Sequence, residues 1–215
     1  MRREKRYGRR LLGLLLFLGL LIAAALLLNG ALRARERRRF ALEGMPIPPL
    51  YQYDYKDVVC TIEGRRKSVS SSGCGAVCMS MAIAYLTGDT AQTPQTLFEE
   101  AYAAGDYNGN GLTHAALDRM ARAHGVEGEW LGKDAAALRR ALESGRPVIA
   151  HMGPGAFTGS GHYILLRGIT ADGQVFVNDP NSESRTWETW ELQGIIDEAK
   201  GGAPFMACRR RGFGL

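Results

Sequence analysis

A cysteine between two glycines is the residue in this sequence best suited to covalent chemistry. Cys74 lies in Ser72-Gly73-Cys74-Gly75 and opens a run of small and apolar residues that predicts a helix over 74–86. A thiol at a helix N-terminus faces unpaired backbone N–H groups and the positive end of the helix dipole, and both favour the thiolate. The flanking glycines leave room for a carbonyl group to approach the sulfur. The pattern predicts a nucleophile, with a plain buried core cysteine as the alternative interpretation.

A cysteine nucleophile needs a base within hydrogen-bond reach. The chain has four histidines, His114, His124, His151 and His162. His114 and His124 lie at the two ends of a polar predicted helix, where we expect them to be solvated. His151 ends an apolar strand and remains the alternative base. His162 follows a Gly/Ser loop and begins an aliphatic strand, a position from which an imidazole can face a cleft, so we expect His162 to be the base.

Two further residues complete the expected site. Asp179 ends the strand that follows His162 across a predicted hairpin, so its carboxylate is expected to orient the imidazole, with turn capping as the alternative role. Gln52 lies 22 residues before Cys74, in a tyrosine-rich stretch. Its amide and the backbone N–H of Cys74 are candidates to bind a developing oxyanion, although spacing alone equally fits an exposed polar residue.

The elements that must position these residues fall into two groups. Besides 74–86, helices are predicted over 94–104, 114–124 and 135–143, and strands over 147–151, 162–169, 174–178 and 204–209. The turn at 170–173 joins two of these strands into a hairpin. Helices first and an antiparallel sheet afterwards predict an α+β fold.

The N-terminal segment predicts a membrane span. Residues 11–28 carry no charge, and at about 1.5 Å per residue they form a helix close to the thickness of a bilayer's hydrocarbon core. The apolar run is longer than that of a secretory signal peptide, and no A-x-A cleavage site follows it, so an uncleaved signal anchor is favoured over a cleaved signal. Six basic residues precede the span and five follow it, so charge does not set the orientation. The usual export of large C-terminal domains places this domain outside the cell.

Charge and proline content divide the chain further. Residues 1–40 hold eleven Lys/Arg and two Asp/Glu, whereas 41–215 hold 16 Lys/Arg and 20 Asp/Glu, which argues against a nucleic-acid partner. Three prolines within 41–50 predict a stiff, extended spacer. We therefore expect a basic tail at 1–10, the anchor at 11–28, a basic and proline-rich linker at 29–49, and one catalytic domain at 50–215.

The candidate residues together resemble a known family. Gln52, Ser72-Gly73-Cys74-Gly75, Gly161-His162-Tyr163-Ile164 and Asn178-Asp179-Pro180 are similar to the bacteriocin-processing-peptidase-like branch of papain-like cysteine peptidases. The resemblance covers about residues 50–209. It implies a papain-like fold in which Cys74 attacks, His162 transfers the proton, Asp179 orients His162 and Gln52 contributes to the oxyanion hole.

Two departures limit what the resemblance implies about substrate. Gly75-Ala76 stands where many such domains have Gly-Pro, and the chain has no Walker A motif, unlike the transporters that carry the peptidases for double-glycine leaders. We therefore expect a stand-alone cysteine peptidase that cleaves a peptide or protein through an acyl-enzyme, with no cofactor. The alternatives are a cell-wall amidase or acyl transferase using the same triad, and a catalytically silent surface binding module.

One motif and two cysteines are left outside this interpretation. Asp106-x-Asn108-x-Asn110-Gly111 matches the first half of a calcium-binding loop, but Leu117 occupies the position that should be Glu, so a turn is favoured over a metal site. Cys60 and Cys208 have no spacing that decides whether they pair. The sequence also leaves the oligomeric state open.

Overall fold

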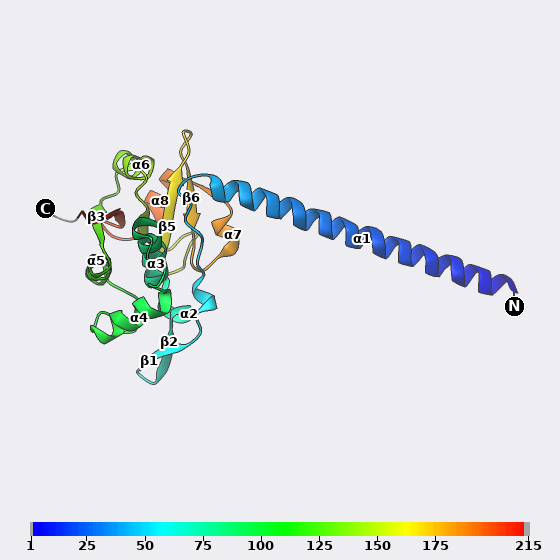
Figure 1. The fold of residues 1–215 in the computed structure, drawn as a ribbon, viewed down its shortest axis with the longest axis horizontal. Helices are drawn as coiled ribbons and strands as arrows, with labels where there is room; N and C mark the ends of the chain where they lie inside the picture. The colour runs from blue at the N-terminus through cyan, green and yellow to red at the C-terminus, as the bar shows by residue number, and fades with distance from the viewer. Residues whose placement is uncertain (1, 213–215) are drawn as a thin grey trace. The chain divides into compact units, whose positions relative to one another are not determined.

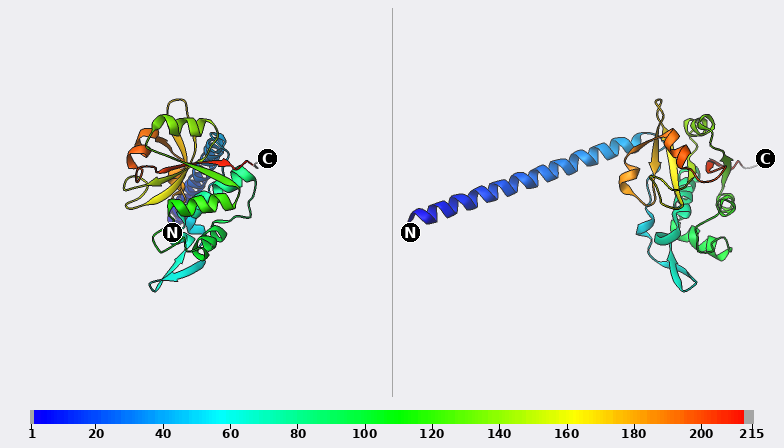
Figure 2. Two further views of the ribbon diagram at one scale, coloured as in Figure 1. Left: turned by 90° about the vertical axis from the view of Figure 1, so that its left-hand side faces the viewer. Right: turned by 180° about the vertical axis from the view of Figure 1, so that it is seen from behind.

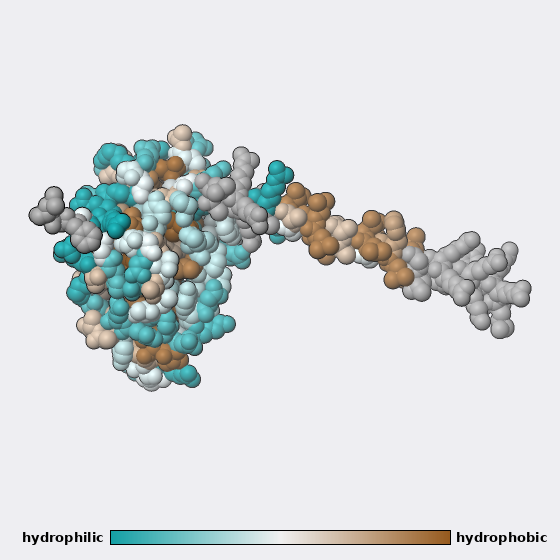
Figure 3. All heavy atoms as spheres, viewed as in Figure 1, coloured by the Kyte–Doolittle hydropathy of each residue, from teal (hydrophilic) through white to brown (hydrophobic). Residues whose placement is uncertain are grey.

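The computed structural model describes residues 2–212, without the side chains of 2–13, 34 and 36–42. The chain separates into two compact units, Met1–Phe40 and Ala41–Leu215. The first unit contains most of helix α1 (Arg2–Leu42), in which Leu14–Arg33 is long and apolar enough to cross a membrane, with a mean hydropathy of 2.5. Figure 3 shows the exposed apolar side chains of this stretch.

Helix α1 extends further than the sequence predicts. It continues through residues 29–42, where we expected a linker. This segment consists mostly of Ala, Leu, Arg and Glu, which favour helix, and the first proline, Pro46, comes after the helix has ended. The segment that follows the helix packs onto the second unit, where the side chains of Met45 and Ile47 are buried.

A six-stranded antiparallel sheet forms the centre of the second unit, in the order β3-β8-β4-β5-β6-β7 (Figures 1 and 2). Its strands are β3 (Val126–Leu131), β4 (Val148–Met152), β5 (His162–Ile169), β6 (Gln174–Asn178), β7 (Thr189–Glu191) and β8 (Phe205–Arg210). Strands β1 (Val58–Ile62) and β2 (Arg65–Ser68) form a separate two-stranded hairpin. All but the last residue of β5 is buried, so both faces of the sheet are covered at this strand.

The helices of the second unit pack against its strands. They are α2 (Val69–Ser72), α3 (Cys74–Thr87), α4 (Pro94–Ala103), α5 (His114–Ala123), α6 (Ala135–Glu143), α7 (Glu183–Thr186) and α8 (Leu192–Glu198), with a short 3-10 helix at Gln52–Asp54. Thr93, Thr113 and Asp134 each accept a hydrogen bond from a backbone N–H in the first turn that follows. Helices α3 and α6 both pack against β5. The predicted α+β fold, with its helical part before the antiparallel sheet, is confirmed.

Residues 43–52 run alongside the β5–β6 hairpin and carry Gln52 to the end of it. The amide of Met45 donates to the carbonyl of Arg167 on β5 at 2.7 Å, and the side-chain amide of Asn178 on β6 donates to the carbonyl of Ile47 at 2.9 Å. The amide of Gln52 then donates to the carbonyl of Pro180 at 2.8 Å. This ladder fixes Gln52 next to the segment that holds Asp179.

Candidate active site

Cys74 is the first residue of α3, and the backbone before it is tightly packed. Gly73 is the residue before the helix, and a Cβ on Gly73 would lie 2.6 Å from the Cα of Val69, so only glycine fits there. Cys74 is partly exposed, whereas Cys78, one turn later, is fully buried. All four cysteines are free, so Cys60 and Cys208 do not form a disulfide.

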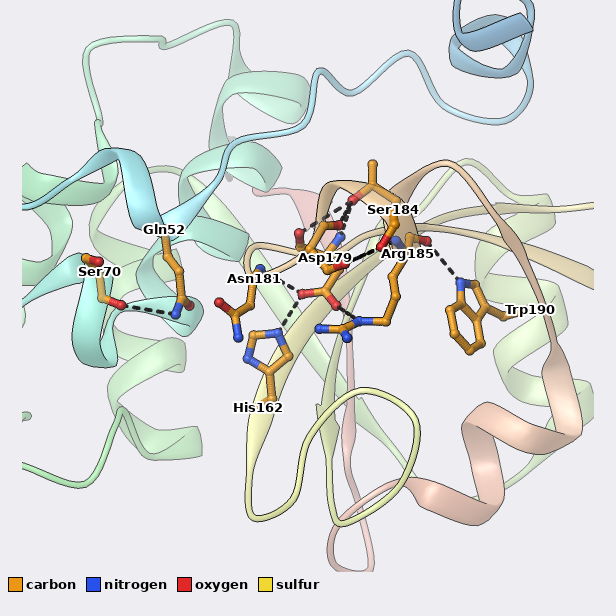
Figure 4. Close-up of polar contacts among 10 residues, drawn as sticks. Gln52, Ser70, His162, Asp179, Asn181, Ser184, Arg185 and Trp190 are labelled. Carbon is orange, nitrogen blue, oxygen red and sulfur yellow. Dashed lines mark hydrogen bonds and ion pairs between the residues drawn. The ribbon is translucent and has the colours of Figure 1, made fainter. Parts of the chain in front are cut away.

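His162 lies between Cys74 and Asp179. It begins β5, while Asp179 follows β6, and the two strands are paired in the predicted hairpin. The Nε2 atom of His162 lies 2.7 Å from Oδ1 of Asp179 (Figure 4), and the side chain of Cys74 lies close enough to the imidazole to raise its pKa. Because Nε2 is occupied by Asp179, Nδ1 is the nitrogen left to face the thiol. The structure therefore brings the three residues together.

Charge within this group favours a protonated imidazole. Burial lowers the pKa of His162, but hydrogen bonds and charge interactions with Asp179 and Cys74 outweigh it and raise the pKa from 6.5 to about 9. Burial raises the pKa of Asp179, yet its hydrogen bonds with His162, Arg185 and the amide of Asn181 hold this pKa below its usual value. At neutral pH the group is therefore an imidazolium held by an ionised carboxylate.

Arg185 is a member of the site that the sequence analysis missed. Its Nε donates to Oδ2 of Asp179 at 2.5 Å, on the opposite side of the carboxylate from His162 (Figure 4). The one-turn helix α7, capped by the Ser182 side chain, places Arg185 there. Arg185 follows Asp179 by six residues, beyond an Asp-Pro-Asn-Ser turn, but this spacing does not distinguish it from the other charged residues of the sequence. If Asp179 orients His162, then Arg185 is a positioning residue that acts through Asp179.

Replacing Arg185 with glutamine is expected to lower kcat/KM about five- to tenfold, because a charge-assisted hydrogen bond to a buried carboxylate is lost. The pKa of Asp179 should also rise, so the acid side of the pH–rate profile should move to higher pH. The measurement is the pH dependence of kcat/KM, with Arg185→Lys as the matched variant that keeps the positive charge but not the geometry of the guanidinium group. An unchanged acid side in Arg185→Gln would show that Arg185 does not position Asp179.

Gln52 is the first residue of the short 3-10 helix Gln52–Asp54. Its side chain is buried, and its Nε2 donates to the carbonyl of Ser70 at 3.2 Å, which leaves the second amide proton free. Gln52 lines the same cavity as Cys74, whose backbone N–H is the other donor expected at an oxyanion. Its placement thus fits the expected role, and the alternative of an exposed polar residue does not hold.

The thiol lies in a cleft between two glycine-rich loops. Residues 109–111 line one wall and residues 157–161 line the other, around a cavity of about 600 Å³. A second pocket of about 260 Å³ shares five residues with this cavity. The shared residues are Cys74, Asn110, Gly111, Gly161 and His162. The two pockets therefore adjoin each other at Cys74 and His162.

The other histidines are engaged elsewhere. Nδ1 of His151 lies 3.2 Å from Nε2 of His114, and His114 stacks on Trp130 with ring centroids 3.9 Å apart. The expectation that His114 is solvated is therefore wrong, because the side chain of Trp130 on β3, a strand that the sequence did not predict, covers its ring. Among the described residues, His151 is hydrogen-bonded to His114 and stacked on Tyr163, whereas His162 is the histidine whose pKa is raised by both Cys74 and Asp179.

The calcium-like loop does not gather ligands. Asp106 forms an ion pair with Arg119, and the side chain of Asn108 accepts from the amide of Asn110 within the turn. Across the part of the chain that the structure describes, no three His, Cys, Asp or Glu side chains are grouped to hold a metal ion.

Known proteins share this fold. Residues 45–200 match the model of the Peptidase_C39 like family. The peptidase domain of Streptococcus ComA, a bifunctional ABC transporter involved in a quorum-sensing pathway, superimposes with a TM-score of 0.52 and 18% identity, over 66% of this chain and 93% of that domain. A double glycine motif protease from an AMS/PCAT transporter, solved in complex with the leader peptide, gives a TM-score of 0.51 and 15% identity, over 79% of this chain and 95% of that one. No curated protein sequence matches the chain.

Proposed function

The chain belongs to the Peptidase_C39 like family, whose model matches most of it, and on this premise we propose that it hydrolyses peptide bonds through Cys74, His162 and Asp179. The family and the fold are those of cysteine peptidases. The observation that carries the proposal is the position of the His162 imidazole, which is hydrogen-bonded to Asp179 and lines the same two pockets as Cys74. This is the arrangement that an activated cysteine requires.

The residues take the following roles in the proposed reaction. The sulfur of Cys74 attacks the carbonyl carbon, and the oxygen that becomes negative is bound by the Gln52 side-chain amide and the Cys74 backbone N–H. His162 gives its proton to the departing amine, and the C–N bond breaks to leave a thioester on Cys74. His162 then takes a proton from water, which attacks the thioester and releases the acid.

An extended peptide is the substrate that the cleft fits. The cavity and the second pocket continue across Cys74 and His162, so a chain can lie between residues 109–111 and 157–161 with residues on both sides of the cut bond. The AMS/PCAT protease was solved with a leader peptide, which supports a peptide substrate for this chain as well.

Thiol alkylation separates an enzyme from a binding module on the same fold. We expect iodoacetamide to modify Cys74 in the full-length protein in detergent micelles, because the other three cysteines are buried. The rate should fall about tenfold or more in His162→Gln, since the imidazole that activates the thiol is lost. Intact-mass spectrometry over time gives the rate, and Cys74→Ala identifies the modified residue. Equal rates in the wild type and in His162→Gln would contradict the proposal.

We also propose that α1 anchors the chain in a membrane with the catalytic domain outside the cell. The 20 residues Leu14–Arg33 are apolar, and the described side chains among them are exposed to solvent in the isolated chain. Full-length protein is then expected in the membrane fraction after alkaline carbonate washing, and added protease should digest the domain on intact cells. Release by the wash, or a product trimmed after residue 28, would show a peripheral protein or a cleaved signal instead.

A further inference from the structure

The smaller of the two pockets beside the thiol is lined by basic nitrogen groups. It is bounded by His151 on β4, Tyr163 on β5 and Lys200 after α8, and by the loop at 110–112. Because it reaches both Cys74 and His162, a substrate residue next to the reacting bond lies within its reach.

Two nitrogen atoms converge on one wall of this pocket. A Cβ built on Gly161 would lie 3.2 Å from Nζ of Lys200 and 3.7 Å from Nε2 of His151. The absence of a side chain at Gly161 therefore leaves both nitrogens open to a group entering the pocket. The amide of Lys200 donates to the carbonyl of His151 at 2.8 Å, which holds the two residues next to each other.

Neither Nζ of Lys200 nor Nε2 of His151 forms a hydrogen bond or ion pair with another described residue. No ion pair or hydrogen bond of Lys200 Nζ is found among the described residues. The nearest acidic residue along the sequence, Glu198, accepts from the amide of Ala156 instead. His151 meets His114 through Nδ1, so its Nε2 is the nitrogen that remains for a ligand. Burial, followed by the charges of His114, Lys200 and His162, lowers the pKa of His151 to about 4, so its ring is neutral at pH 7.

We propose that this pocket binds a carboxylate on one of the two substrate residues that precede the cut bond, so that the peptidase prefers acidic substrates. This inference rests on the proposed function. Lys200 supplies a charge-assisted hydrogen bond to the carboxylate. The neutral imidazole of His151 donates from Nε2 in the tautomer in which Nδ1 accepts from His114. A glycine at this position of the substrate leaves Nζ of Lys200 and Nε2 of His151 without a partner. A lysine or arginine at this position is repelled by the positive charge of Lys200.

Matched peptide aldehydes test this assignment. The sulfur of Cys74 adds to the aldehyde carbon and the oxygen takes up a proton, so inhibition reports binding in the site without cleavage. The probes are N-acetyl-Glu-glycinal and N-acetyl-Gln-glycinal, together with N-acetyl-Gly-glutamal and N-acetyl-Gly-glutaminal. We expect one of the glutamyl aldehydes to bind the full-length protein in micelles about five- to tenfold more tightly than its glutaminyl partner. Lys200→Gln should remove this preference, and Lys200→Glu should reverse it.

Controls separate this inference from the proposed function. Lys133→Gln removes the same charge from a residue that lines neither cavity and should keep the preference. Equal binding within both pairs, or a preference that survives in Lys200→Gln, would overturn the pocket assignment alone. If no aldehyde binds and iodoacetamide reacts equally with the wild type and with His162→Gln, the proposed function is overturned and the pocket assignment with it.

Discussion

Cys74→Ala is expected to reduce peptide hydrolysis by about 10⁴-fold or more, because no other side chain can form the acyl-enzyme and binding alone supplies little of the rate. The effect should be larger than that of any other single substitution in the cleft. It can be measured by incubating the full-length protein in micelles with a peptide library made from a whole-cell digest and counting new termini by mass spectrometry.

Cys60→Ala is the matched control for this substitution. Cys60 is a buried cysteine on β1 that lines neither cavity, so its replacement should leave the cleavage pattern and rate close to those of the wild type. Cleavage by Cys74→Ala within tenfold of the wild type would assign the reaction to another residue.

His162→Gln is expected to reduce kcat/KM by about 10³- to 10⁴-fold, since both activation of the thiol and protonation of the leaving amine depend on the imidazole. Glutamine keeps a hydrogen-bonding side chain of similar reach but cannot carry the proton. The steady-state rate on a peptide identified in the library gives the size of the loss. His151→Gln serves as the comparison, and a larger loss there would make His151 the base.

His162→Gln is also expected to change how the free energy of unfolding depends on pH. The pKa of His162 is raised from 6.5 to about 9 in the folded protein. A group whose pKa is higher in the folded state stabilises that state fully when the pH is below the pKa of the unfolded chain. This stabilisation is lost as the pH rises through the pKa of the folded protein. The wild type should therefore exceed His162→Gln in unfolding free energy below pH 6.5, and this difference should shrink by on the order of 3 kcal/mol between pH 6.5 and 9. Urea unfolding at several pH values measures it, and a difference that does not change over this range would contradict the charged imidazole.

The parts of the fold that could be predicted have strong local signals. Thr113 and Asp134 cap helices that start where expected, and the apolar run of β5 with the turn after it identifies the hairpin. Strands β2 and β3 were missed because RRKS and VEGEWL carry charges at successive or alternate positions, and β3 gains its order from pairing with the distant strand β8. Tertiary pairing of this kind leaves little trace in the local pattern.

The same division applies to the site. Cys74, His162 and Asp179 could be proposed from residue type and position at element ends, because a helix N-terminus and a hairpin fix where such side chains lie. Arg185 and Lys200 could not, since each is one charged residue among many and gains its place from a turn or a loop that the sequence does not specify. The burial of Arg167 was equally hidden, because its partners are backbone carbonyls of Glu43 and Met45, more than 100 residues earlier.

The most direct test of Cys74 as the nucleophile is to trap the acyl-enzyme. A peptide ester that carries the acyl half of a cleaved library peptide should acylate the enzyme faster than water removes the acyl group, so the intermediate accumulates. After acid quenching and digestion, the fragment containing Cys74 should gain the mass of the acyl group and lose it in neutral hydroxylamine, as a thioester does. Turnover of the ester with no hydroxylamine-sensitive adduct on Cys74, or with the adduct on another residue, would show that Cys74 is not the nucleophile.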